Sequence, residues 1–131
     1  MAYEGQQILV PALVAGEDLS AKQYYYVKLS ANNTVIAPTL ATDIPIGVLQ
    51  NNPDASGKSA TVCSIGVTKV SSNEALTAGW LIGTSADGQA DRKIAGTDPT
   101  EYITGQVIVG STAAAGLAVA VINCASVSRA A

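Results

Sequence analysis

The sequence contains no histidine, and this absence excludes several kinds of catalytic chemistry. Histidine is the commonest general base and the commonest metal ligand near neutral pH. A Ser-His-Asp or Cys-His arrangement is therefore impossible. Carboxylates do not replace it: Glu17 and Asp18 form the only adjacent acidic pair, and they lie just after a glycine corner, where acids commonly accept backbone hydrogen bonds. We expect no catalytic residue and no enzyme activity.

The other acidic residues lack the spacing of a metal site. Asp87, Asp91 and Asp98 lie on expected turns near Gly88 and Gly96, but their spacing matches no known calcium loop. The glycines sit among strand-like runs, without the following helix that a phosphate loop requires. The sequence therefore predicts no metal site and no cofactor.

Charge is scarce as well. Charged residues make up 13% of the 131 residues, against roughly 25% in typical soluble domains. The formal net charge is −3, and the seven basic residues are scattered singly apart from Arg92 and Lys93. Because phosphate binding needs clustered lysine and arginine, the sequence argues against a nucleic-acid partner. A surface this poor in charge is typical of a protein that packs against another surface.

Long apolar runs and phenylalanine are also missing. Aromatic residues amount to 5% of the chain, and no apolar run reaches the roughly 18 residues that a membrane-spanning helix needs. The N-terminus lacks the basic start of a signal peptide. We therefore expect a soluble protein that is made in the cytosol and has no membrane partner.

The two cysteines, Cys63 and Cys124, lie far apart in the sequence, each within an apolar alternating run. This context favours burial as small hydrophobic side chains. A disulfide between strands is the alternative, which a reducing compartment makes less favourable.

What the sequence does contain is apolar residues at a spacing close to two, cut into short runs by Gly, Asn, Asp, Ser and Thr. This pattern predicts an all-β fold: a small β-barrel or β-sandwich of about eight short, mostly antiparallel strands. Asn32-Asn33 and Asp87-Gly88 are expected hairpin turns. The expected strands are Tyr24 to Ser30, Thr34 to Pro38, Ile44 to Gln50, Ser59 to Val70, Leu81 to Ser85, Gln89 to Ile94, Tyr102 to Val109 and Leu117 to Asn123.

An extended N-terminal arm precedes the strands. The first seven residues are polar and unpatterned, and the apolar segment from Ile8 to Val14 is interrupted by Pro11. Because proline cannot donate to a strand ladder, this segment is expected to be an edge strand or an extended tether. We divide the chain into an arm (residues 1–14), a single β domain (15–124) and a C-terminal tail (125–131) whose role stays open.

Three consecutive tyrosines suggest an interface. Alternation with the apolar residues that follow puts Tyr25 on the core face and both Tyr24 and Tyr26 on the opposite face. Tyrosine is enriched at protein interfaces, so Tyr24 and Tyr26 are predicted to contact a neighbouring subunit. Trp80, directly after Gly79, is either core filler or a contact.

The segment from Thr42 to Val70, TDIPIGVLQNNPDASGKSATVCSIGVTKV, reads as a β-hairpin without chemistry. Its pattern of D-x-P-I-G-V-L-Q-N, a P-x-x-x-G loop and A-T-V-x-x-x-G-V-T-K-V resembles the small capsid decoration, or head cement, proteins of tailed bacteriophages. AGEDLSAKQYYYVKLSANNTV (15–35) and YITGQVIVGSTAAAGLAVAVIN (102–123) are similar to the same family. The resemblance therefore covers most of the chain.

The resemblance implies a structural virion protein that binds the outer surface of an assembled capsid and cements neighbouring capsomers, stabilising the expanded shell. The implied partners are the major capsid protein and further copies of the chain in a homotrimer. The implied location is the outer capsid surface, after synthesis in the host cytoplasm. The candidate interface residues are Tyr3, Ile8, Leu9, Val10, Tyr24, Tyr26 and Trp80.

A β-sandwich binding module, for example for carbohydrate, remains the alternative function. Such a module would be free or displayed on a virion, and it needs exposed aromatic side chains in a shallow groove. Tyr24, Tyr26 and Trp80 are the residues able to serve in that way.

Overall fold

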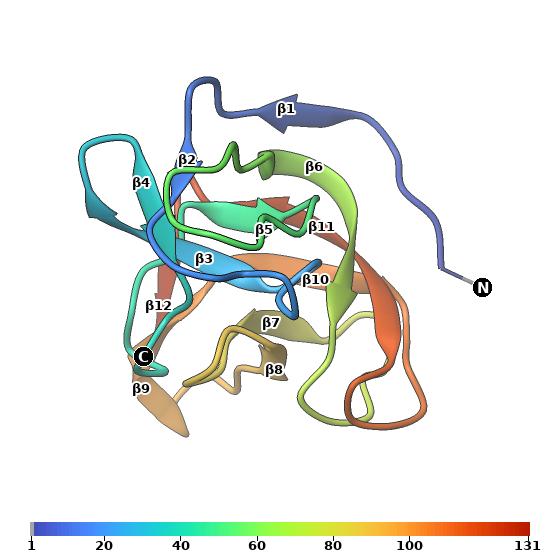
Figure 1. Ribbon diagram of the computed structural model, residues 1–131. Helices are drawn as coiled ribbons and strands as arrows, with labels where there is room; N and C mark the ends of the chain where they lie inside the picture. Colours follow the sequence, from blue (N-terminus) through green and yellow to red (C-terminus); the bar gives the residue numbers. More distant parts are fainter. Residues whose placement is uncertain (1) are drawn as a thin grey trace.

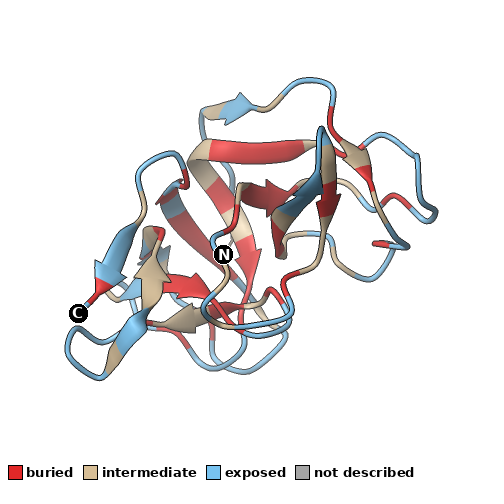
Figure 2. Ribbon diagram, turned by 90° about the vertical axis from the view of Figure 1, so that its left-hand side faces the viewer, coloured by how far each residue is buried: buried red, intermediate tan, exposed pale blue. Residues whose placement is uncertain are grey.

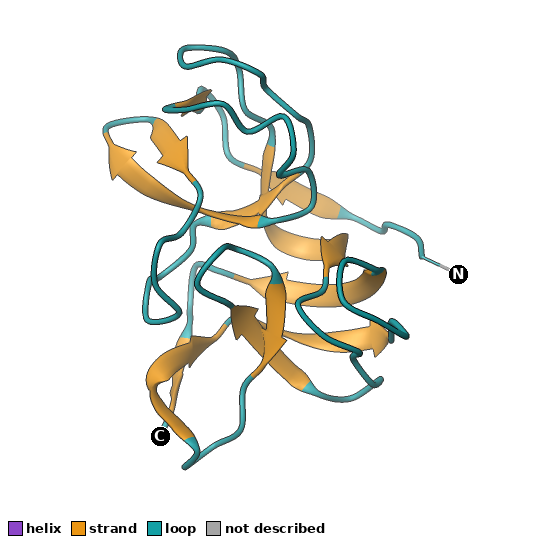
Figure 3. Cartoon of the chain, turned by 60° about the horizontal axis from the view of Figure 1, so that its bottom comes forward, coloured by secondary structure: helices purple, strands orange, loops and turns teal. Residues whose placement is uncertain are grey.

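Every regular element among the described residues is a β-strand. The computed structural model describes residues 2–131, and within that range twelve strands are joined by turns and loops (Figures 1 and 3). The predicted all-β fold is confirmed, with more strands than expected. The strands are β1 (Gln7–Leu9), β2 (Val14–Ala15), β3 (Tyr26–Ala31), β4 (Thr34–Ile36), β5 (Gly47–Leu49), β6 (Val62–Ser71), β7 (Leu81–Thr84), β8 (Ala90–Arg92), β9 (Asp98–Ile103), β10 (Gly105–Val109), β11 (Leu117–Asn123) and β12 (Ser128–Ala130).

Strand bounds agree best with the prediction where alternation is clear. β11 has its predicted bounds, and Asn33 adopts a φ of 56° in the turn between β3 and β4. The strand predicted at Tyr102 to Val109 is instead two strands, because Thr104 separates β9 from β10. β9 pairs with β12 in a separate two-stranded sheet. β12 lies in the C-terminal tail, where no apolar alternation indicated a strand.

The main sheet has ten strands and curls into a barrel. Its order is β2-β4-β3-β5-β6-β11-β10-β7-β8, with β1 paired to β6, and β2 with β4 is the one parallel strand pair in the described range. At the end of this order, β8 returns to the end of β6. Ser72 and Ala90 form an isolated bridge there, and the Asn73 N–H donates to the Ala90 carbonyl at 2.8 Å. Strands β6, β11, β10, β7 and β8 therefore close into a barrel.

Two hydrophobic clusters lie on the two faces of β3, β5 and the start of β6. Neighbouring residues of a strand point to opposite faces, so these strands are apolar on both. Buried residues accordingly follow the central strands, while exposed residues gather in loops (Figure 2). The inner cluster includes Tyr26, Val48, Cys63, Ile82, Val107 and Ile122. The outer cluster includes Leu13, Leu19, Val27, Val35, Leu49 and Val62.

The predicted orientation of Tyr26 is wrong. Tyr26 is fully buried in the inner cluster, and its hydroxyl accepts a hydrogen bond from the Thr104 hydroxyl at 2.8 Å. The alternation failed here because β3 is buried on both faces at its start and because Tyr24, with a φ of 67°, precedes the strand. Tyr26 therefore cannot belong to an interface or a sugar-binding groove.

The predicted burial of both cysteines is confirmed. Cys63 and Cys124 are free thiols in the inner cluster. Burial raises the pKa of Cys63 to about 11 and that of Cys124 to about 12, with a smaller contribution from Glu4 at Cys63 and from Cys63 at Cys124. Both thiols are therefore protonated at neutral pH, which makes them poor nucleophiles.

The β9–β12 sheet is fastened to the barrel at β7 and β8. A side chain at Gly83 of β7 would collide with the Tyr102 carbonyl of β9, so glycine allows the two strands to cross closely. The Lys93 side chain, just after β8, is fully buried and pairs with Glu101 of β9 and, at 3.6 Å, with Asp91. A buried cation with two carboxylate partners thus links β8 to β9.

The N-terminal arm, defined here as residues 2–10, lies along β6. β1 pairs with β6 antiparallel over Gln7–Leu9, so the segment predicted at Ile8 to Val14 is divided: its first two residues belong to β1, and Val14 begins β2. Gly5 donates its N–H to the Val67 carbonyl at 3.0 Å, and Val67 donates to the Gln6 carbonyl at 3.0 Å. Gly66 has a φ of 140°, and a side chain there would collide with the Gln6 carbonyl. The arm therefore needs glycine at position 66 to reach its place.

Replacing Tyr26 with phenylalanine should destabilise the protein by about 1.5 kcal/mol, because the buried Thr104 hydroxyl loses its 2.8 Å hydrogen bond and keeps only a long one, of 3.5 Å, to the Ile82 carbonyl. Urea unfolding measures the change in free energy. The matched control is Tyr3→Phe, which removes an exposed hydroxyl and should change stability by less than about 0.5 kcal/mol. Equal effects of the two variants would contradict the role given to Tyr26.

Replacing Gly66 with alanine should displace the arm from β6, so that chymotrypsin cleaves after Tyr3 and Leu9 while the barrel stays resistant. Gly57→Ala is the control for backbone strain, because Gly57 has a φ of 90° but open space where its side chain would lie. The arm should stay protected in Gly57→Ala. Wild-type protection of the arm in Gly66→Ala would show that the close approach is not required.

Asp91 should make stability depend on pH. Burial, together with a hydrogen bond to the Glu74 carboxyl, raises the pKa of Asp91 to about 6, although Lys93 opposes this. The folded state therefore holds the proton more tightly than the unfolded chain, and this stabilising contribution is lost as the pH rises through 6. Asp91→Asn should gain stability relative to the wild type between about pH 4 and about pH 7, measured by urea unfolding. A constant difference between the two proteins would contradict the assignment.

Candidate docking surface

The outer side of the barrel carries a face without charged residues. No charged residue occurs between positions 102 and 128, a stretch that includes β10 and β11. The neighbouring strand β7 is also uncharged, and β6 carries a single charge at Lys69. Because β6, β11, β10 and β7 are adjacent in the barrel, their outward residues form one continuous surface (Figure 1).

Strand register assigns residues to this surface in two rows. Leu81 pairs with Gln106, Gln106 with Val121, and Val121 with Val67, so these four side chains share the outward face. The second row runs from Asn123 to Ile65 and on to Ile8 of the arm. We call this surface the uncharged face. It consists of Ile8, Ile65, Val67, Leu81, Gln106, Val121 and Asn123.

Large apolar side chains of the uncharged face are open to solvent. Ile8 is 59% exposed, Val121 43% and Leu81 41%. Contiguous exposed apolar residues mark interaction sites more often than isolated ones do. With amide side chains as its polar members, the face offers apolar area and neutral hydrogen-bonding groups to a partner.

Two shallow hollows open on the uncharged face. One, of about 430 Å³, lies between the arm and β6 and is lined by Gln6, Gln7, Ile8, Ile65 and Gly66. The other, of about 280 Å³, lies over β7, β10 and β11 and includes Leu81, Gln106, Val121, Asn123 and Ser128. Neither hollow is lined by a charged residue. They can accept apolar or amide groups, but they hold no acid or base for proton transfer.

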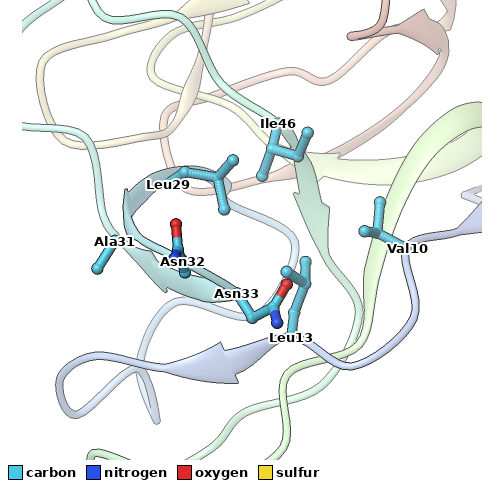
Figure 4. A pocket seen from close by; sticks show the side chains of 7 residues that line it. All are labelled: Val10, Leu13, Leu29, Ala31, Asn32, Asn33 and Ile46. Carbon is cyan, nitrogen blue, oxygen red and sulfur yellow. The ribbon is translucent and has the colours of Figure 1, made fainter.

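A third hollow, also of about 430 Å³, lies away from the uncharged face, beside the β3–β4 hairpin. Figure 4 shows Leu29 and the two asparagines of the hairpin on one side of it, with Leu13, Ile46 and Val10 contributed by other segments. Its lining is apolar apart from the two asparagines, and it too has no charged group. Its full lining is Val10, Leu13, Leu29, Ala31, Asn32, Asn33 and Ile46.

The arm residues predicted for an interface are accessible in the structure. Tyr3, Ile8 and Leu9 are exposed, and Ile8 belongs to the uncharged face. Val10 is half-buried and lines the hollow beside the β3–β4 hairpin. The arm side chains thus extend from the uncharged face towards that hollow.

Tyr24 and Trp80, which were also predicted for an interface, are not among the residues of the uncharged face. Tyr24 and Trp80 are half-buried and pack against the inner cluster. Burial, assisted by the nearby Glu4 carboxylate, raises the pKa of the Tyr24 hydroxyl. For Trp80, this packing corresponds to the core role rather than to an exposed contact. The structure therefore places Tyr24 beside Glu4 of the arm, with its ring half-buried, and leaves Trp80 packed against the inner cluster.

Four aromatic rings have a lysine or arginine side chain over one face. A ring whose face holds a cation is not open for stacking on a sugar or a base, which disfavours the carbohydrate-binding alternative. The distances from charged group to ring centroid are 4.8 Å for Lys22 on Tyr25, 5.5 Å for Lys69 on Tyr24, 3.9 Å for Arg92 on Trp80 and 5.6 Å for Arg129 on Tyr102.

Sequence reasoning missed most of the uncharged face. Leu81, Gln106 and Val121 were expected only as strand residues, and Ile65 only as part of a hairpin face. The uncharged run from 102 to 128 was the available signal, because exposed strand positions normally carry some charge. The pairing of β7 with β10 and of β6 with β11 was still needed to show that these strands continue the same surface.

Two kinds of feature are absent from the described residues: a cluster of metal-binding side chains and a membrane-spanning helix. Residues 2–131 contain no group of three or more His, Cys, Asp and Glu side chains arranged to hold a metal ion. The same range contains no helix of the length and apolar character needed to cross a membrane.

Comparison with known proteins gives one informative likeness. The sequence matches no known family and no curated protein. Among solved structures, the fold is similar to the N base of the head fiber gp8.5 in bacteriophage phi29, with a TM-score of 0.65 and 16% sequence identity. The likeness covers 91% of this chain and 96% of that chain. At this identity it establishes that the two chains share their fold.

Proposed function

We propose that this protein is a structural component of a phage virion that attaches to the outer surface of the capsid. The observation that carries the proposal is the fold likeness to a head fiber base, which extends over nearly the whole of both chains. The resemblance of the Thr42 to Val70 segment to head cement proteins supports the same role independently. The protein would act by binding and would perform no chemical step.

The finer proposal is that the protein cements neighbouring capsomers by contacting the major capsid protein, as a homotrimer. A contact that buries roughly 1,000 Å² is large enough to be specific, and repetition over the capsid lattice multiplies modest affinities. A protein that binds the expanded shell and not its precursor stabilises the expanded state by mass action. The low charge of the chain suits such a role.

The uncharged face is the proposed capsid-binding surface. Apolar and amide side chains lose little on leaving water, whereas a charge buried without a partner is costly. Interface centres are accordingly depleted in charged residues. Leu81, Val121 and Ile8 supply the exposed apolar area that such a centre requires.

A charged residue placed on the uncharged face should weaken capsid binding. We expect Val121→Glu to weaken co-sedimentation with undecorated expanded capsids by at least about tenfold, because the new carboxylate would be buried without a partner. Leu40→Glu is the matched control, since Leu40 is an exposed leucine on a loop outside the uncharged face. Both variants should unfold at wild-type urea concentrations.

The same preparation tests the cementing role. Wild-type protein should raise the melting temperature of the expanded capsid, and Val121→Glu should fail to do so. If Val121→Glu binds like the wild type and Leu40→Glu does not, the docking surface is misassigned. If the wild type does not bind capsids at all, the proposed function is wrong.

A further inference from the structure

The turn between the arm and the barrel is strained. Pro11 and Ala12 connect β1 to the buried Leu13 and β2, and Ala12 has a φ of 63°. This left-handed conformation is unfavourable for alanine, because its side chain approaches the following carbonyl. Val10, which precedes proline, is restricted to extended conformations. The chain does not reverse here: the Leu13 carbonyl accepts from the Ala60 N–H at 3.0 Å, and Ala15 donates to the Lys58 carbonyl at 2.8 Å. Pro11 and Ala12 therefore form a strained bulge in a path that stays antiparallel to residues 58–67.

Few side chains hold the arm in place. Val10 packs against the outer cluster, but Ile8 is 59% exposed and Leu9 49%, so these two side chains add little buried apolar area to the arm. It is held mainly through the backbone: Gly5 and Val10 each donate to a β6 carbonyl at 3.0 Å, those of Val67 and Val62. An arm bound in this way can leave and return without unfolding the core.

The site on β6 nevertheless makes contacts that depend on the sequence of this arm. The Gln7 side chain donates to the Val67 carbonyl at 3.1 Å and to the Gln50 side chain at 3.4 Å. Gly66 provides the close approach for the Gln6 carbonyl. An arm from another copy of the chain would make the same contacts, whereas an unrelated strand would lack the glutamine.

We infer that the arm is exchanged between copies, so that β1 of one molecule pairs with β6 of another. The exchange keeps every arm contact and replaces the strained Ala12 turn with an extended connection. Short hinge segments under strain are known to promote such swapping. Exchange leaves the residues of both hydrophobic clusters in place, but Val10 packs against the outer cluster and Glu4 lies beside Tyr24, so these two arm contacts must form again in the acceptor molecule. The inference concerns copies of this chain alone and does not depend on capsid binding.

Cysteine cross-linking tests the exchange. Ile8 and Ile65 are register partners, so Ile8→Cys in one molecule and Ile65→Cys in another can form a disulfide only when the arm has crossed over. The two variants, one carrying a mass tag, are mixed in urea, refolded together at high concentration and treated with oxidised glutathione. We expect a cross-linked heterodimer. Wild-type protein treated alike should give none, because Cys63 and Cys124 are buried.

Three comparisons make the result decisive. A mixture of Ile8→Cys with Val121→Cys measures cross-linking by random collision, because Val121 is exposed on β11 and is not a register partner of the arm. This control mixture should give at least about fivefold less heterodimer than the mixture of Ile8→Cys with Ile65→Cys. Adding Ala12→Gly to the arm-donating variant relieves the strained turn and should lower the yield about fivefold. The double variant Ile8→Cys/Ile65→Cys reports pairing within one molecule.

Exchange is rejected if the Ile8→Cys and Ile65→Cys mixture gives no more heterodimer than the collision control while the double variant cross-links internally. It is equally rejected if the double variant forms no disulfide at all, because the arm then does not occupy β6. A yield unaffected by Ala12→Gly would remove the strained turn as the cause. Heterodimer that forms on refolding, with all three comparisons as expected, supports exchange.

Discussion

The structure depends on the burial of both faces of β3, β5 and the first part of β6. Tyr26, Val48 and Cys63 face the inner cluster, while their chain neighbours face the outer one. A chain without phenylalanine has few large side chains for a core. Here each of these strands adds apolar area to two hydrophobic clusters, one on each face, and this increases the area that is buried on folding. The Tyr26 hydroxyl is a polar group that this arrangement buries in the inner cluster, and it is paired there with the Thr104 hydroxyl.

Glycines then decide how further strands attach to this framework. Gly66 admits the arm against β6, and Gly83 admits β9 against β7. With Lys93 pairing to Glu101, these close approaches add the β9–β12 sheet and the arm, and Val10 of the arm packs against the outer cluster. The remaining outer side of β6, β11, β10 and β7 stays uncovered, and Lys69 is the one charged residue that these four strands carry.

An uncovered, uncharged sheet face and a loosely held arm suit a protein whose work is binding. The same fold occurs in the N base of a bacteriophage head fiber. The strain at Ala12 adds a second means of joining molecules, by sharing a strand instead of a surface. The two devices are compatible, because Ile8 contributes to the uncharged face when the arm is paired to β6.

Alternation along the sequence determined the all-β class, the bounds of β11 and the burial of Cys63 and Cys124, because these follow from the pattern within one strand. Tertiary structure alone decided that Tyr26 is buried and that Leu81, Val121 and Ile65 share one face. The physical reason is that a side chain's surroundings depend on which distant strands cover it. Strand register, set by pairing between segments far apart in the chain, is not encoded in the local alternation of either strand.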